Sequence, residues 1–129
     1  MVEDFIVYIS KRKDKKLIKK LKRNGMKLRF LSDKNKNIRK YVLEAVKQNG
    51  MALEYASDIL KNDYNIVLTA VRQNGFAYFW ASENLKYNIN IIVESLKQNI
   101  EVANIIPEKI QKYKNYFISK IDYEYHGPE

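Results

Sequence analysis

The chain has 129 residues, with 24 Lys and Arg against 15 Asp and Glu, a net charge of +9, and no cysteine. The length is that of one domain, and it is sufficient to bury a hydrophobic core without stabilising cross-links. The lack of cysteine excludes disulfides and thiolate chemistry. The apolar run FIVYI (5–9) is too short to cross a membrane, and Glu3 and Asp4 precede it where a signal peptide would carry positive charge. We therefore expect a soluble, intracellular protein.

The positive charge is concentrated at one end of the chain. Residues 1–40 hold 15 basic and 4 acidic residues, a net +11, whereas residues 41–129 hold 9 basic and 11 acidic residues, a net −2. The basic segment KRKDKKLIKKLKRNGMKLR (11–29) contains a thin apolar stripe of Leu17, Ile18 and Leu21, as on one face of a helix. The candidate nucleic-acid-binding residues flank this stripe: Lys15, Lys16, Lys19, Lys20, Lys22 and Arg23.

Three interpretations of the basic segment stay open. It can be the solvated face of a capping helix, because runs of charge are often no more than that. It can bind RNA or DNA, and its lysines would then contact phosphates without reading the base sequence. It can also lie on an acidic membrane, although the stripe is narrow and lacks an anchoring aromatic residue.

The same segment begins a repeat of 25 residues. KRNG, KQNG and RQNG end at Gly25, Gly50 and Gly75, KQNI ends at Ile100, and the flanking residues align without a gap. We expect a single domain over 1–129, with units at about 15–39, 40–64, 65–89 and 90–114, a capping segment at 115–123 and a flexible tail at 124–129. Because no copy can bury its apolar face alone, the repeat predicts an all-α fold, a short α-solenoid of four to five helical units.

The third copy indicates what each unit contains. Its apolar residues predict a helix over about 64–73, with counterparts near 41–49 and 90–99. Asn62 or Asp63 is the expected N-cap, and Gly75 is expected to stop the helix in the left-handed conformation. An apolar segment follows at 76–81, and Ser82 begins a short turn over 82–86 at the position that Ser32, Ser57 and Pro107 occupy in the other copies.

The alignment of the copies also predicts which residues are buried. We expect Val67, Leu68, Val71 and Trp80 in the core, with their counterparts Val42, Leu43, Val46 and Tyr55. Phe79 falls in a column that holds Arg29, Glu54 and Asn104 in the other copies, so we expect it to be exposed. An exposed phenylalanine among polar equivalents is a candidate protein-interaction residue, although isolated apolar residues are common on surfaces.

The second copy, RKYVLEAVKQNGMALEYASDILKND (39–63), resembles a unit of the helical tandem-repeat family called domain of unknown function 4116. Units of that family have an aliphatic-rich helix followed by Gln-Asn-Gly, ALEYAS, a leucine and Asn-Asp, and the resemblance is best over residues 39–113. It implies a helical repeat scaffold and no assigned chemistry. Lys20, Lys34, Asn35 and Ile100 depart from the pattern, which we interpret as end effects.

We expect no catalytic site, no cofactor, no metal and no small-molecule substrate. The one histidine, His126, is near the end of the chain, and the spacing in DYEYH (122–126) matches no metal site. Asp58, Glu83 and Glu108 recur at one repeat position, as carboxylates that favour a helix N-terminus do. We expect a non-catalytic scaffold that binds a protein partner or a larger assembly; the alternative is a nucleic-acid-associated protein, such as a small ribonucleoprotein subunit, that binds RNA or DNA through its basic end.

Overall fold

The computed structural model describes the backbone of residues 1–126 and the side chains of residues 1–121. Every regular element within residues 1–126 is helical, and no strand is present there, as predicted. The longer helices are α1 (Val2–Arg23), α3 (Arg39–Gln48), α5 (Tyr64–Gln73), α7 (Ile89–Gln98) and α8 (Lys114–His126). Between them lie the short helices α2 (Asp33–Lys36), α4 (Asp58–Lys61) and α6 (Glu83–Lys86), and the 3-10 helices η1 (Gly25–Phe30), η2 (Gly50–Tyr55), η3 (Gly75–Trp80), η4 (Ile100–Asn104) and η5 (Glu108–Tyr113).

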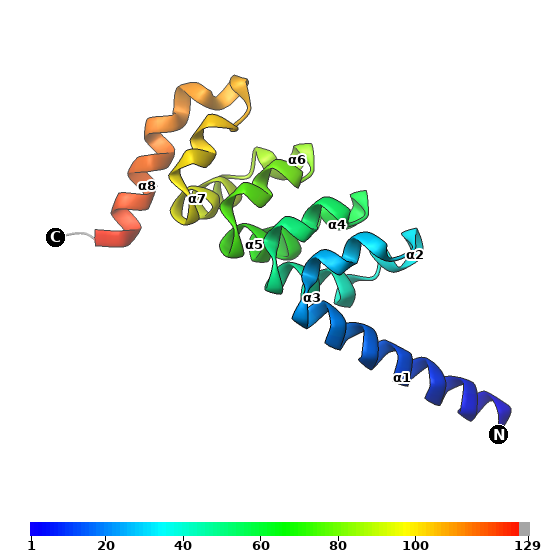
Figure 1. Ribbon diagram of the computed structural model, residues 1–129. Coiled ribbons are helices and arrows are strands. Elements are labelled where there is room, and N and C mark those ends of the chain that lie inside the picture. Colours follow the sequence, from blue (N-terminus) through cyan, green and yellow to red (C-terminus); the bar gives the residue numbers. More distant parts are fainter. Residues whose placement is uncertain (127–129) are drawn as a thin grey trace.

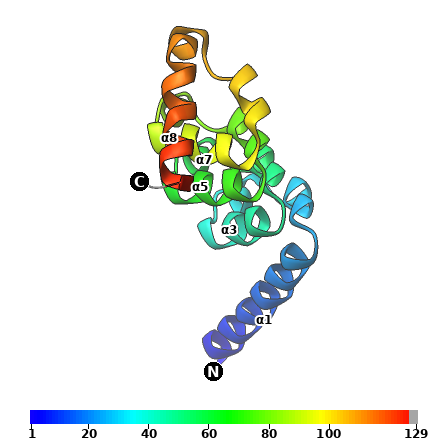
Figure 2. The ribbon, with the colours of Figure 1, turned by 90° about the vertical axis from the view of Figure 1, so that its left-hand side faces the viewer.

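The longer helices pack against one another in chain order. α1 contacts α3, α3 contacts α5, α5 contacts α7, and α7 contacts α8, so the chain progresses in one direction from blue to red (Figure 1). The 3-10 helices η1, η2 and η3 form a second row beside them, each in contact with the next. The N-terminal half of α1 runs out from the stack, and a view from the side shows the same (Figure 2).

Side-chain caps place the helix starts where the sequence predicts them. The Asp63 carboxylate accepts a hydrogen bond from the backbone N–H of Ile66 at 3.1 Å and begins α5. The hydroxyls of Ser57 and Ser82 likewise accept from the N–H three residues on and begin α4 and α6. Of the tail expected at 124–129, residues 124–126 belong to the backbone of α8, and the remainder lies outside the described residues.

The repeated glycine has a different role from the predicted one. α5 ends at Gln73, its C-cap Asn74 has an extended backbone with a φ of −149°, and none of the glycines that begin η1, η2 and η3 has a left-handed φ. Glycine is required because the next long helix comes close: a Cβ on Gly50 would lie 2.2 Å from the carbonyl oxygen of Ala70. A Cβ on Gly25 would likewise lie 2.1 Å from the Ala45 oxygen, and a Cβ on Gly75 would lie 2.6 Å from the Ser95 oxygen.

The glutamine and asparagine before Gly50 and Gly75, and their counterparts before Ile100, act at the same contact. The side-chain oxygen of Gln73 accepts a hydrogen bond from the N–H of Gly50 at 2.5 Å, so the third unit is joined to the second. The side chain of Asn49 accepts from the N–H of Met51 at 3.0 Å and caps η2. Equivalent bonds join Gln48 to Gly25 and Gln98 to Gly75. In Gln-Asn-Gly the first residue therefore links two units, the second caps a helix, and the third permits close packing.

A second row of bonds between units runs along the short helices. The N–H of Ser57 donates to the carbonyl oxygen of Lys36 at 3.0 Å, and the N–H of Ser82 donates to that of Lys61 at 2.9 Å. Pro107 occupies the equivalent position in the fourth copy and has no N–H to donate. This row of backbone bonds therefore does not extend to the fourth copy. The fourth copy is also the one in which Ile100 replaces the repeated glycine.

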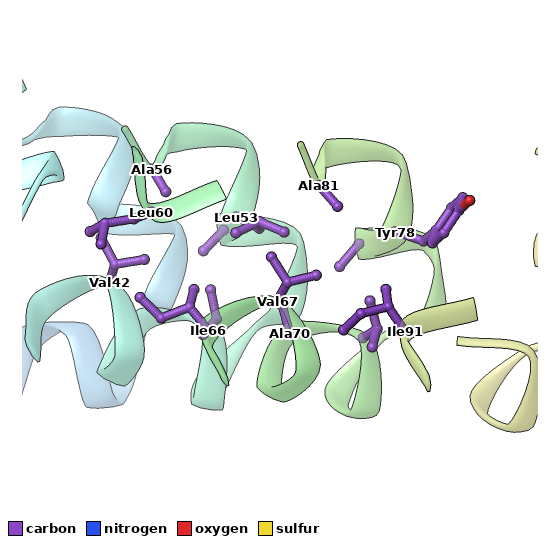
Figure 3. Packing of buried hydrophobic residues seen from close by; sticks show 14 of the residues in the cluster. Val42, Leu53, Ala56, Leu60, Ile66, Val67, Ala70, Tyr78, Ala81 and Ile91 are labelled. Atoms are coloured by element: carbon purple, nitrogen blue, oxygen red, sulfur yellow. The ribbon is translucent and has the colours of Figure 1, made fainter. Parts of the chain in front are cut away.

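The core runs through the stack between the two rows of helices (Figure 3). Val42, Val46, Val67 and Val71 are fully buried, as predicted, whereas Leu43, Leu68 and Tyr55 are only half-buried. Trp80 is likewise only half-buried against the core, and Tyr78 is the fully buried aromatic side chain of η3. A 3-10 helix has three residues per turn, so Gly75, Tyr78 and Ala81 share one buried edge, and Trp80 shares the next edge with the fully buried Ala77.

Candidate interaction surfaces

The six basic residues singled out in the sequence all lie on α1. Their side chains are exposed, and none of them forms an ion pair with another described residue. The stripe that they flank packs as expected: Leu21 is fully buried, and Leu17 and Ile18 are half-buried against the core. The stripe therefore attaches α1 to α3, and the cations are left in solvent.

Some of these cations occupy positions that face a neighbouring helix in the later units. On α3 the positions in contact with α1 and η1 include Tyr41, Ala45 and Gln48. One repeat earlier, the same positions on α1 hold Lys16, Lys20 and Arg23. A helix packed there as α1 packs on α3 would bury these charges without partners, at a cost of several kcal/mol. This face of α1 therefore stays open to solvent or to an anionic partner.

Asp14 is the one acidic residue in the basic segment, and it joins α1 to α3. Its carboxylate lies 2.8 Å from the Lys40 ammonium and accepts a hydrogen bond from the Tyr41 hydroxyl at 2.5 Å. The hydrogen bond from Lys40 and then that from Tyr41 lower the pKa of Asp14. In return, the bond to the carboxylate and burial raise the pKa of Tyr41 to about 12. Asp14 thus fixes the middle of α1 and contributes no free negative charge.

The first two turns of α1 carry an exposed apolar segment that the sequence reasoning missed. Val2, Phe5, Ile6, Val7 and Tyr8 are helical, and their exposed fractions range from 51% to 73%. The run FIVYI is too short to span a membrane, and the 25-residue repeat does not reach it. The signal was available, because Glu3 and Asp4 are suited to a first helical turn and no Gly or Pro interrupts residues 2–23.

Phe79 lies on the surface, as predicted, with 53% of its area exposed. Its ring meets that of Trp80 edge to face, with 4.8 Å between the ring centroids, and the Lys86 ammonium lies 5.5 Å from its centroid. The ring therefore contacts Trp80 and Lys86 while about half of the residue's surface stays exposed. The structure does not bring Phe79 together with the cations of α1, since the two are carried by η3 and α1.

A hollow of about 470 Å³ lies between α5, α7 and α8. Tyr64, Leu68 and Tyr116 contribute apolar surface to it, and the Arg72 guanidinium pairs with the Glu94 carboxylate at 3.2 Å on its wall. The half-buried Leu68, predicted to be core, is thus part of an open surface.

Among the described side chains, no three His, Cys, Asp or Glu residues gather as they would around a metal ion. Asp58 and Glu83 lie in the first turns of α4 and α6, where carboxylates complement the helix dipole. The side chains of residues 122–126, including His126, lie outside the described ones. No described helix combines the length and the apolar character needed to cross a membrane.

Comparison with known proteins identifies a family of repeats. A family model described as "Domain of unknown function (DUF4116)" matches residues 38–86 and, separately, residues 66–111. The two matches share residues 66–86, as expected when one family model is laid twice over a repeated sequence. Together they cover 38–111, more than half of the chain. No curated protein and no solved structure matches it.

Proposed function

The chain belongs to the family of the domain of unknown function 4116, and on that premise we propose that it is a non-catalytic scaffold, a short α-solenoid of four to five 25-residue helical repeats that binds another protein through its stacked helices. The recurring bonds between units support the solenoid, since Gln-to-Gly bonds occur at three successive junctions. Stacked repeats of this kind expose long, rigid surfaces and are widely used for binding.

The observation that carries the binding proposal is the exposed ring of Phe79. The equivalent positions hold Arg29, Glu54 and Asn104, so the repeat itself does not need an apolar residue there. Aromatic side chains held rigidly on a surface supply much of the binding energy at protein interfaces. The ring of Phe79 is held in this way by Trp80 and Lys86, and we assign to it the centre of the partner surface.

Replacing Phe79 with glutamate tests this surface. The fold should tolerate the change, because Glu54 occupies the same position in the preceding unit. The full chain is recovered with its partners from native cells, with and without nuclease treatment. We expect a partner that resists nuclease and whose affinity falls about 30-fold in Phe79→Glu, as at an interface hot spot. Asn104→Glu, in the same column, is the matched control and should bind normally; equal binding by all three proteins would place the interface elsewhere.

The second candidate function is binding to RNA or DNA through α1. The observation that favours it is the group of six exposed cations without ion pairs, which a polyanion could neutralise. Such contacts would be made to phosphates and would show little sequence preference.

A salt series measured by filter binding tests this candidate. If about five phosphates are neutralised on duplex DNA, the logarithm of the affinity should fall with the logarithm of salt at a slope of roughly −4 to −5. Changing Lys15, Lys16, Lys19, Lys20 and Arg23 to Gln should abolish binding and leave α1 helical, because the helix propensities are similar. A flat salt response, or equal binding by the variant, would remove this candidate.

A further inference from the structure

The first two turns of α1 extend beyond the stack without cover. The ion pair at Asp14 is the first side-chain link between α1 and α3, and every side chain from Met1 to Tyr8 is exposed. Residues 2–9 span about 12 Å at the rise of an α-helix. Because successive residues are about 100° apart, the five residues FIVYI present apolar groups around the whole helix. This is a concentrated apolar segment whose first four residues are exposed, and Ile9 at its end is half-buried.

The apolar segment continues into the cations on one side of α1. Phe5, Tyr8 and Ile9 are spaced three and four residues apart, and the same spacing leads on to Arg12, Lys16, Lys19, Lys20 and Arg23. Glu3 and Asp4 fall outside this series, and Asp14 is turned toward α3. One face of α1, pointing away from the stack, therefore carries aromatic and aliphatic groups at its N-terminal third and positive charge along the rest.

Two other occupants account for only part of this face. A nucleic acid would neutralise the cations but would leave the large apolar side chains in water, since the phosphates that it offers are polar. A second copy could cover the apolar segments, but two helices touching over 12 Å bury roughly 500 Å², well below what a stable protein interface needs. Any longer overlap would bring the cations of the two copies together.

We propose that α1 lies on an anionic phospholipid surface, with Phe5, Tyr8 and Ile9 inserted at the boundary between headgroups and acyl chains. The cations that follow would contact the phosphate and carboxylate groups of the lipids. Phe5 and Tyr8 provide the aromatic residues that the basic segment lacks when it is considered alone, and aromatic side chains favour this depth of a bilayer. This role goes beyond that of a scaffold, because it would place the protein at a membrane surface. It does not depend on binding of a partner at Phe79.

Sedimentation of the full chain with lipid vesicles tests the proposal. At physiological salt, wild type should bind vesicles of phosphatidylcholine with roughly 30% phosphatidylserine at least about tenfold more tightly than vesicles of phosphatidylcholine alone. The double variant Phe5→Ser/Tyr8→Ser should lose about tenfold in binding to the anionic vesicles, because its apolar contact is removed. Val7→Ser is the matched control: Val7 is exposed in the same turn but lies outside the series, so its binding should stay within about twofold of wild type.

Several outcomes would overturn the proposal. Equal binding by wild type and the double variant would mean that charge alone attracts the chain to the vesicles. Binding of wild type to a single-stranded RNA oligonucleotide but not to the anionic vesicles would assign α1 to nucleic acid. Self-association of wild type in analytical ultracentrifugation, lost in the double variant while vesicles fail to bind, would assign the segment to a second copy. Circular dichroism of each variant confirms that α1 is still formed.

Discussion

Replacing Gly50 with alanine should lower the free energy of unfolding by about 3 kcal/mol, although the change adds a single methyl group. The new Cβ would lie 2.2 Å from the Ala70 oxygen, 3.1 Å from the Ala70 carbonyl carbon and 3.2 Å from the Asn74 nitrogen. All three are backbone atoms, so no side chain can turn aside. α5 must instead move away from η2, which also strains the hydrogen bond from the Gly50 N–H to Gln73. Urea denaturation followed by circular dichroism measures the loss.

Related substitutions identify the cause of this loss. Gly75→Ala should cost less, since the Ser95 oxygen is farther away at 2.6 Å and the next neighbour is the side chain of Gln98. Ile100→Ala should change stability by less than about 0.5 kcal/mol, because Ile100 is exposed. Gly50→Asn separates the two explanations of the glycine: asparagine tolerates the left-handed conformation but not the close contact, so it should cost at least as much as alanine. A mild effect of Gly50→Asn would contradict the close-contact explanation.

Replacing Val71 with aspartate should unfold the protein at room temperature. Val71 is fully buried on α5, among the apolar side chains that join the second unit to the third and fourth. A buried carboxylate without a partner costs several kcal/mol, and the whole protein is stabilised by only about 5–15 kcal/mol. We expect loss of the helical circular dichroism signal, or a melting temperature lowered by more than about 10 °C.

Asn65→Asp is the charge-matched control for this prediction. Asn65 is exposed in the first turn of the same helix, where a negative charge complements the helix dipole, so the variant should melt within a few degrees of wild type. If Val71→Asp melts as the control does, the assignment of the buried face of α5 is wrong.

The positions of the helices could be predicted from the sequence because they depend on local signals that recur. Asp63 and Ser82 are caps in the structure as in the prediction, and the buried valines follow the helical period. The role of Gly50 could not be predicted in this way. A repeated glycine shows that glycine is needed in each copy, but it does not show why. The close approach of the Ala70 oxygen to Gly50 exists only when two units are packed together, so the sequence of one unit does not reveal it. Tyr78 could not be singled out over Trp80 as the fully buried aromatic side chain of η3, because alignment of copies does not give the phase of a 3-10 helix.

The basic residues of the candidate site could be predicted as exposed, since charge and a narrow apolar stripe together define the faces of a helix. The extent of α1 could not be derived from the repeat. Residues 2–9 have no counterpart in the other units, so the alignment that organises residues 15–114 does not reach them. The only sequence signal for residues 2–9 is that a helix can continue through them into the first unit without interruption. Their exposure follows because no other described helix packs against them.

The hydrogen bonds that Gly25, Gly50 and Gly75 donate to the glutamine of the next unit have a consequence for how such a chain can change during evolution. Each junction uses the same atoms, so duplication of a gene segment that encodes one full period, placed between α3 and α7, creates a new junction already equipped with its donor, acceptor and cleared space. An insertion of any other length would separate the glutamine from its glycine. The gene can therefore lengthen or shorten its product in whole units. The end copies are less suited to duplication, because Lys16 and Lys20 would bury unpaired charge in a junction, Ile100 would fill the space that glycine leaves open, and Pro107 has no N–H to donate.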